Sequence, residues 1–294
     1  MVPIRRTASY NADQSVLTLS RLKTRMADAE ERASTGLRIQ LPSDAPEIWT
    51  SMNRLRAEQQ DQVTYMANAD RGETWLAASE NALKTVSDIL KRVKERAIQL
   101  GSDTISAEDR TNGANEINAL RQELIDVANT QLDGRYLFSG TALNVAAFDQ
   151  NGVYQGSNEI PDMQVGRDTR VSTGYDGSQV FQGAVNTFQV LSDLSTALAA
   201  NDSTAVRNMI STVDAGIEQN IQWWEENGYR TATMDDMKQI ASNLDMLSQN
   251  QLGNLVNADP AQSFTELAEL RSNYEATLAV VGSSRSTNLF NYIG

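Results

Sequence analysis

The sequence predicts a mainly α-helical protein. We expect an elongated antiparallel helical rod or coiled coil formed by the N- and C-terminal halves, with a small β-hairpin-rich insert near the middle of the chain. Of the 294 residues, 40% are hydrophobic but only 6% are aromatic, which suits thin helical layers better than one thick core. Apolar residues recur at alternating steps of three and four, as in coiled coils. All five prolines fall at predicted boundaries or in loops.

The first predicted helix carries a narrow apolar seam and stops at Gly36. A loop follows over residues 37–44, where Pro42 and Pro46 bracket Ser43-Asp44, a signal for the N-cap of the next helix. The seam consists of Leu19, Leu22, Met26, Ala29 and Ala33.

Two further helices are expected to form an antiparallel pair. The first runs from about residue 46 to 100, and Gly101 is its predicted C-cap. Ser106 is the predicted N-cap of the next helix, and the short connection between the two favours antiparallel neighbours. The heptad of the long helix is Leu76, Leu83, Val86, Leu90, Val93, Ala97 and Leu100.

Short segments punctuated by glycine occupy the middle of the chain, from Asp133-Gly134 to about Gly183. Asn151-Gly152 lies between two of them and is a hairpin signal. We therefore expect two or three hairpins here.

Helix returns after Asn186. Residues 204–258 repeat the seam in two pieces that break at Asn227-Gly228, and Asp259-Pro260 marks a second break. The two pieces carry Ile210, Val213, Ile217 and Trp224, then Met237, Ile240, Leu244, Leu247, Gln251 and Leu255. A last helix from about residue 261 carries Leu267, Leu270, Tyr274, Leu278 and Val281, and the apolar tail includes Leu289 and Phe290.

These patterns divide the chain into five predicted regions. The N- and C-terminal regions together form a terminal helical domain, and rod helices flank the insert. The boundaries are 1–41, 42–133, 134–185 (the insert), 186–259 and 260–294.

The composition removes most enzyme chemistry. With no Cys and no His, the chain lacks thiolate nucleophiles, imidazole bases and the usual zinc or haem ligands. We expect no enzymatic activity, no cofactor and no metal site. Asp149 begins a calcium-like loop, but Tyr154 stands where glycine is needed, so a turn is predicted. Trp224 lies on the apolar stripe and is assigned to core or interface packing.

Charge and hydropathy also exclude two classes of partner. The net charge of −13 argues against nucleic acid, which requires a basic face. No apolar run is long enough to span a bilayer, so no membrane insertion is expected. The first residues do not form an apolar leader, which predicts a cytosolic protein or one exported by another route.

The terminal seams predict helix-to-helix assembly. A narrow stripe cannot stabilise an isolated helix, so it must be buried against a partner. The expected interface consists of the seam residues named above for the first and last helices, together with Leu289 and Phe290.

Two motifs resemble those of the flagellin superfamily. Residues 34–46 are similar to the segment that closes the first helix of flagellin-type proteins, and residues 134–141 are similar to a segment of the proteins that join hook to filament. The motif positions are Gly36, Arg38, Pro42, Ser43, Asp44, Gly134, Arg135, Tyr136, Phe138 and Gly140.

The resemblance implies a secreted structural subunit of the bacterial flagellum, exported unfolded by the flagellar type III apparatus. It implies a tubular lattice of copies of the chain, with a hook-side adaptor and flagellin as neighbours, and it allows for an export chaperone. Two alternatives stay open: a filament-forming flagellin of the same superfamily and, more distantly, a cytosolic helical binding module.

Overall fold

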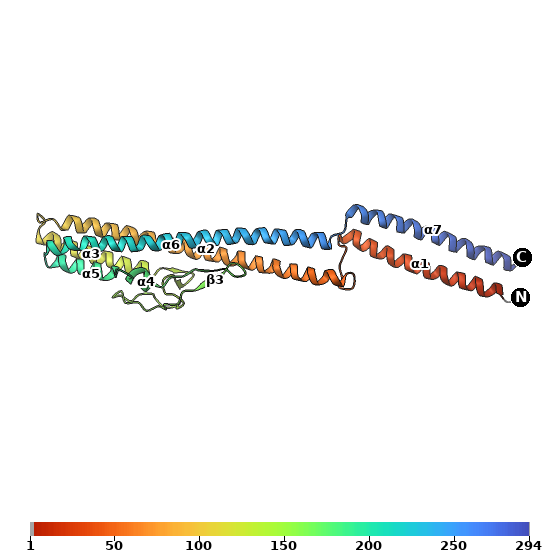
Figure 1. Ribbon diagram of the computed structural model, residues 1–294, viewed down its shortest axis with the longest axis horizontal. Helices are drawn as coiled ribbons and strands as arrows, with labels where there is room; N and C mark the ends of the chain where they lie inside the picture. Colours follow the sequence, from red (N-terminus) through yellow and green to blue (C-terminus); the bar gives the residue numbers. More distant parts are fainter. Residues whose placement is uncertain (1–2, 294) are drawn as a thin grey trace. The chain divides into compact units, whose positions relative to one another are not determined.

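The computed structural model describes the main chain of residues 3–293 and the side chains of residues 13–282. It confirms the mainly α class. Figure 1 shows long helices and, beside some of them, a small region of short strands and turns. In chain order the elements are α1 (Pro3–Thr35), α2 (Pro46–Leu100), α3 (Ala107–Ala128), β1 (Gln131–Leu132), β2 (Arg135–Tyr136), β3 (Asp162–Gln164), β4 (Arg170–Ser172), α4 (Gly177–Gln182), α5 (Thr187–Ala199), α6 (Ser203–Val256) and α7 (Pro260–Ile293).

The chain forms two compact units. One contains residues 1–59 and 246–294, and the other contains residues 60–245. Leu289 and Phe290 belong to the predicted interface, but they lie outside the residues whose side chains the structure describes.

In the first unit, α1 and α7 run antiparallel. Two ion pairs fix this direction: Arg32 with Glu266 at 3.2 Å and Arg271 with Glu30 at 3.4 Å. The pairing therefore joins a segment from the first part of the sequence to one from the last part.

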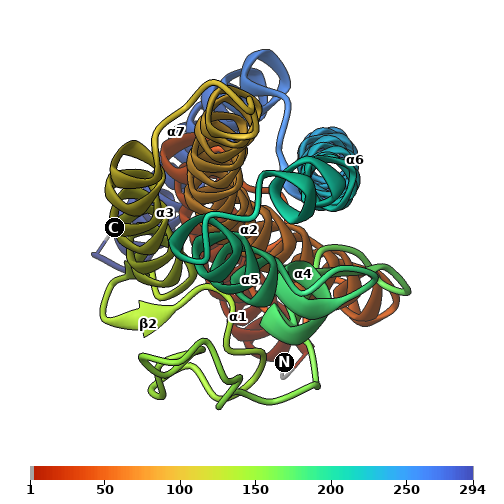
Figure 2. The same ribbon diagram turned by 90° about the vertical axis from the view of Figure 1, so that its left-hand side faces the viewer.

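In the second unit, α2 and α6 also run antiparallel. Trp224 donates its ring N–H to Glu80 at 3.3 Å, and Lys94 pairs with Asp214 at 2.6 Å. Seen end-on in Figure 2, α3 and α5 lie beside α2, and the strands and loops of the insert lie below them.

The predicted pairing of α2 with α3 is confirmed. Arg96 of α2 contacts Glu116 of α3 at 2.9 Å. Both predicted boundaries are correct: α2 ends at Leu100, and the Ser106 side chain accepts a hydrogen bond from the N–H of Asp109.

The core of the second unit follows the predicted heptad of α2. These side chains are at most 7% exposed and pack with residues of α3, α5, α6 and the insert in one continuous cluster. The predicted heptad members in this cluster are Leu76, Leu83, Val86, Leu90, Val93, Ala97 and Leu100.

A buried arginine closes one end of this unit. Arg110, only 5% exposed, donates to the carbonyl oxygens of Leu100 at 3.0 Å and Ser102 at 2.7 Å. It also donates to the side chain of Asn201, in the turn between α5 and α6. The cation therefore lies at the negative end of the α2 dipole and ties two turns together.

The predicted break at Asn227-Gly228 is wrong, because α6 is continuous from Ser203 to Val256. Asn227 is fully buried and donates to the carbonyl oxygen of Leu76 at 3.2 Å, so its side chain stabilises the helical conformation. A helical glycine costs about 1 kcal/mol, which tertiary packing of this kind can outweigh. The break at Asp259-Pro260 is correct, since α7 begins at Pro260.

The seam predicted for the second half of α6 is correct only in part. Met237 and Leu255 pack against buried residues. Ile240, Leu244 and Leu247 are 48%, 44% and 52% exposed, whereas the smaller Ala241 and Ser248 are buried. Helices that approach closely bury small side chains, so the largest apolar residues did not mark the inner face.

The core position predicted for Trp224 is occupied by its neighbour Trp223. Trp224 is 44% exposed, whereas Trp223 packs edge-on against Tyr175, with ring centroids 6.0 Å apart. Core packing therefore falls to Trp223.

Two hairpins form in the region of the predicted insert, β1–β2 and β3–β4, with strands of two or three residues. The first begins at Gln131, before the predicted start of the insert at residue 134. At Asn151-Gly152 the chain turns, but only one bridge, between Phe148 and Tyr154, flanks it. Asp149 accepts hydrogen bonds from the N–H groups of Asn151 and Val153, which is the turn expected in place of a calcium loop. The insert also contains α4, which the sequence analysis did not predict.

Candidate assembly site

The predicted seam residues of α1 and α7 lie on a thin helical pair. Of these residues with described side chains, Ala29 and Leu270 are buried, and Leu278 is 43% exposed. The remaining ones are half-buried: Leu19, Leu22, Met26, Ala33, Leu267, Tyr274 and Val281. The pair thus leaves part of its apolar seam in contact with water.

The loop after α1 holds the first motif. Gly36 has φ +70°, a left-handed conformation that favours glycine, and its N–H donates to the carbonyl oxygen of Arg32 at 2.9 Å. Glycine therefore ends the helix and redirects the chain.

A short antiparallel contact joins this loop to the end of α6. The N–H of Arg38 donates to the carbonyl oxygen of Val256 at 2.7 Å, and the N–H of Ala258 donates to that of Gly36 at 2.9 Å. The Arg38 guanidinium adds a bond to the carbonyl oxygen of Leu255 at 2.8 Å. Arg38 therefore fastens two segments that lie more than 200 residues apart in the chain.

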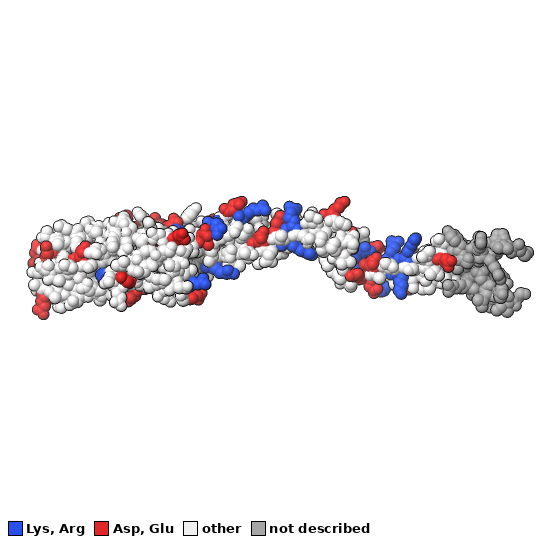
Figure 3. Space-filling view, turned by 90° about the horizontal axis from the view of Figure 1, so that it is seen from below, with Lys and Arg blue, Asp and Glu red and all other residues white. Residues whose placement is uncertain are grey.

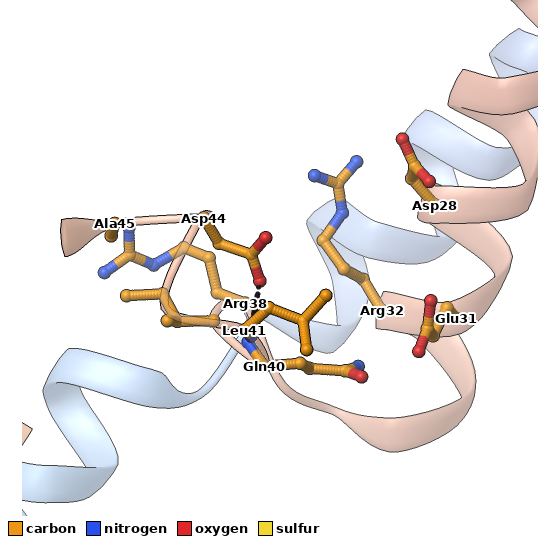
Figure 4. Close-up of a pocket in the computed structure, with 9 residues that line it drawn as sticks. Asp28, Glu31, Arg32, Arg38, Gln40, Leu41, Asp44 and Ala45 are labelled. Carbon is orange, nitrogen blue, oxygen red and sulfur yellow. Dashed lines mark hydrogen bonds between the residues drawn. The ribbon is translucent and has the colours of Figure 1, made fainter. Parts of the chain in front are cut away.

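Asp44 organises the loop itself rather than the start of α2. Its carboxylate accepts hydrogen bonds from the N–H groups of Gln40 at 3.0 Å and Leu41 at 2.8 Å, as Figure 4 shows. These two bonds, the Leu41 one first, lower the pKa of Asp44 below 3.8. The sequence-based assignment of Ser43-Asp44 as the N-cap of α2 is therefore wrong. Pro42 and Ser43 are exposed in the turn that the carboxylate closes.

The loop borders a pocket of about 470 Å³. Figure 4 shows that Asp28, Glu31 and Arg32 contribute to it from α1. Because acidic and basic side chains line it together, the pocket has no single charge preference.

We expect Asp44→Ala to release the loop. Without the carboxylate, hydrogen exchange at the amides of Gln40 and Leu41 should accelerate, and amide exchange measured by NMR would report it. Because folding lowers the pKa, the stabilisation is complete above pH 3.8, the unfolded value, and is lost as the pH falls through the lower folded value. Asp28→Ala, in the same pocket, is the control. Unchanged exchange at these two amides in Asp44→Ala would contradict the assignment.

The second motif forms the centre of the insert. Asp133 and Gly134 have φ +51° and +76° and make the two-residue turn between β1 and β2. In β2, Arg135 is exposed and Tyr136 is half-buried. Phe138 is fully buried and packs edge-on against Phe181, with centroids 5.2 Å apart.

Gly140 connects this motif to two other loop segments of the insert, at Tyr175 and at Ser157–Glu159. Its N–H donates to the carbonyl oxygen of Tyr175 at 3.0 Å, and its φ is +61°. A Cβ at this position would lie inside van der Waals contact of the carbonyl oxygen of Ser157 and 2.6 Å from that of Glu159. Only glycine fits this crossing of main chains.

Burial raises the pKa of two phenols of the insert. The pKa of Tyr154 is raised to about 12, chiefly by burial, and burial raises the pKa of Tyr175 further. Both hydroxyls therefore act as hydrogen-bond donors: Tyr154 to the carbonyl oxygen of Ser157 at 2.9 Å and Tyr175 to Asn227.

Other site types have no support in the described part of the chain. No group of three carboxylates there could hold a metal ion, and none of the described helices has the length and hydropathy of a membrane span. On the face in Figure 3, outside the grey atoms, basic and acidic side chains are interspersed.

The family described as bacterial flagellin N-terminal helical region matches residues 7–142. This match covers just under half of the chain. Flagellar hook-associated protein 3 of Escherichia coli is 27% identical over 265 residues, covering 87% of this chain and 76% of that protein. The protein of the same name from Salmonella typhimurium is 32% identical over 154 residues, covering 51% of this chain. That match spans 48% of the Salmonella protein, about half its length.

A solved structure supports the fold. The putative flagellar hook-associated protein from Vibrio parahaemolyticus superposes with a TM-score of 0.66 at 20% identity, covering 73% of this chain and all of that chain. The resemblance that the two sequence motifs indicated is borne out by the match to the flagellin N-terminal region and by the similarity to hook-associated protein 3.

Proposed function

We propose that the chain is a structural, non-enzymatic subunit that joins the hook to the filament of the bacterial flagellum. The similarity to hook-associated protein 3, which extends over most of the chain in the E. coli alignment, carries this proposal. The partly exposed seam of α1 and α7 supports assembly as the mode of action, because packing between copies would remove its remaining apolar surface from water.

The partners follow from that role. Copies of the chain would form a tubular lattice through the terminal helices, with a hook-side adaptor below and flagellin above. Before export, a chaperone would keep the terminal helices from associating. Export would then deliver the chain unfolded to the outside of the cell.

A charge in the seam is expected to abolish incorporation. In the double variant Leu22→Asp/Met26→Asp, two half-buried positions would carry carboxylates that cannot be desolvated without a partner. The variant should disappear from isolated flagella and abolish motility, while hydrogen exchange of residues 60–245 stays unchanged. Immunoblotting of sheared flagella and a swarm assay measure the two effects.

The matched control is Ser20→Asp/Thr24→Asp, which has the same spacing and charge at exposed positions of α1. It should incorporate. Normal incorporation of the seam variant would show that α1 makes no assembly contact.

Two observations separate the alternatives. A filament-forming flagellin would grow long polymers from purified protein alone, whereas a junction subunit would form short polymers or none. A cytosolic binding module would be absent from sheared flagella and from the culture medium.

A further inference from the structure

The inner face of α6 is defined by positions exactly one heptad apart within residues 60–245. All of them are at most 3% exposed, and the two in the middle of the row are asparagines. In order they are Val206, Val213, Asn220, Asn227, Met234 and Ala241.

Both asparagines reach the main chain of α2. Asn220 donates its Nδ2–H to the carbonyl oxygen of Leu83 at 3.0 Å, and Asn227 donates to that of Leu76 at 3.2 Å. The donors and the acceptors are each seven residues apart. Moving α6 by one heptad would therefore offer both amides equivalent carbonyls, and these two bonds cannot define the alignment alone.

The second amide atom breaks this symmetry. Oδ1 of Asn227 accepts the hydroxyl hydrogen of Tyr175 at 2.5 Å, whereas Oδ1 of Asn220 is buried without a hydrogen-bond partner. Tyr175 belongs to the insert, so the chain of bonds from Tyr175 through Asn227 to Leu76 links the insert to both long helices.

Tyr175 sits where the insert meets α6. Its ring contacts Phe138, with centroids 5.8 Å apart, and the guanidinium of Arg230 lies 4.8 Å above it. Its carbonyl oxygen accepts the N–H of Gly140. Aromatic contacts of this kind tolerate sliding, whereas a buried hydroxyl-to-amide bond is satisfied in one geometry only.

We propose that Asn227 is a positioning residue that fixes where the insert packs against α2 and α6. Its amide serves as donor to one helix and acceptor for the insert, so the insert cannot move without leaving a buried polar group unpaired. Asn220, at the equivalent heptad position, has no such role. This inference does not depend on the proposed flagellar function.

The test compares isosteric substitutions. In Asn227→Leu and in Tyr175→Phe, hydrogen exchange at the amides of Gly140, Ser157 and Gly177 should accelerate about tenfold, because each substitution leaves one buried polar group unpaired. Asn220→Leu, which removes an acceptor that is already unpaired, should leave these three amides unchanged. Amides of α2 and α3 report that the helices remain folded.

The double variant Tyr175→Phe/Asn227→Leu completes the cycle. Because neither group is then left unpaired, its three insert amides should exchange more slowly than those of Asn227→Leu alone. Equal effects of Asn220→Leu and Asn227→Leu would overturn the proposal, as would unchanged exchange in Tyr175→Phe, which removes one oxygen atom and leaves the ring in place.

Discussion

Gly140→Ala should destabilise the insert by about 3–5 kcal/mol, because two costs combine at this residue. The left-handed φ of +61° strains any residue with a side chain, and the new methyl group would press on the carbonyl oxygens of Ser157 and Glu159. Both neighbours are main-chain atoms held by hydrogen bonds, so neither can move aside cheaply. Denaturant unfolding, with hydrogen exchange at residues 136–177, would measure the loss.

Gly134→Ala is the matched control. This glycine has a φ of +76°, but a Cβ there would meet no atom within 4 Å, so only the conformational strain of about 1–2 kcal/mol applies. Equal losses for the two variants would show that the crossing of main chains at Gly140 contributes nothing.

Leu90→Ala should cost the second unit about 2–5 kcal/mol. Leu90 is 1% exposed in the middle of the continuous core of residues 60–245, where a lost side chain leaves a cavity that the long helices cannot close. In a Trp49→Phe background every remaining tryptophan lies in this unit, so fluorescence during urea unfolding follows it alone.

Ile98→Ala on the same helix is the control. Its side chain is 55% exposed, and substitutions at such positions usually change stability by no more than about 0.5 kcal/mol. A loss at Leu90 no larger than at Ile98 would place Leu90 outside the core.

Where one helix face carries large apolar residues, the sequence predicted the structure well. The heptad of α2 lies in the core of the second unit. As predicted, α1 ends directly before Gly36 and α2 ends directly before Gly101. These features depend on interactions within a few residues of each other, which a single sequence displays directly.

α6 shows why the same reasoning fails elsewhere. Its inner face uses Asn220, Asn227, Ala241 and Ser248, residues that pattern analysis assigns to surfaces or turns. The two asparagines donate to carbonyl groups of α2 that lie more than 130 residues away in sequence. The exact seven-residue spacing of these positions was the signal that could have identified the face.

The motif residues were located by resemblance, but their physical roles required the structure. The sequence offered Asp44 as a helix cap, whereas its carboxylate binds two amides of the preceding loop. Similarly, nothing in the sequence pairs Gly140 with Tyr175 and Ser157, because long-range main-chain contacts carry no side-chain pattern.

The pairing of Gly36–Arg38 with Val256–Ala258 has a consequence for truncated chains. The unit formed by residues 1–59 and 246–294 requires both of these segments, whereas residues 60–245 form a compact unit of their own. Truncating the chain after residue 245 should therefore leave α1 without its antiparallel neighbour while the middle of the chain keeps its partners.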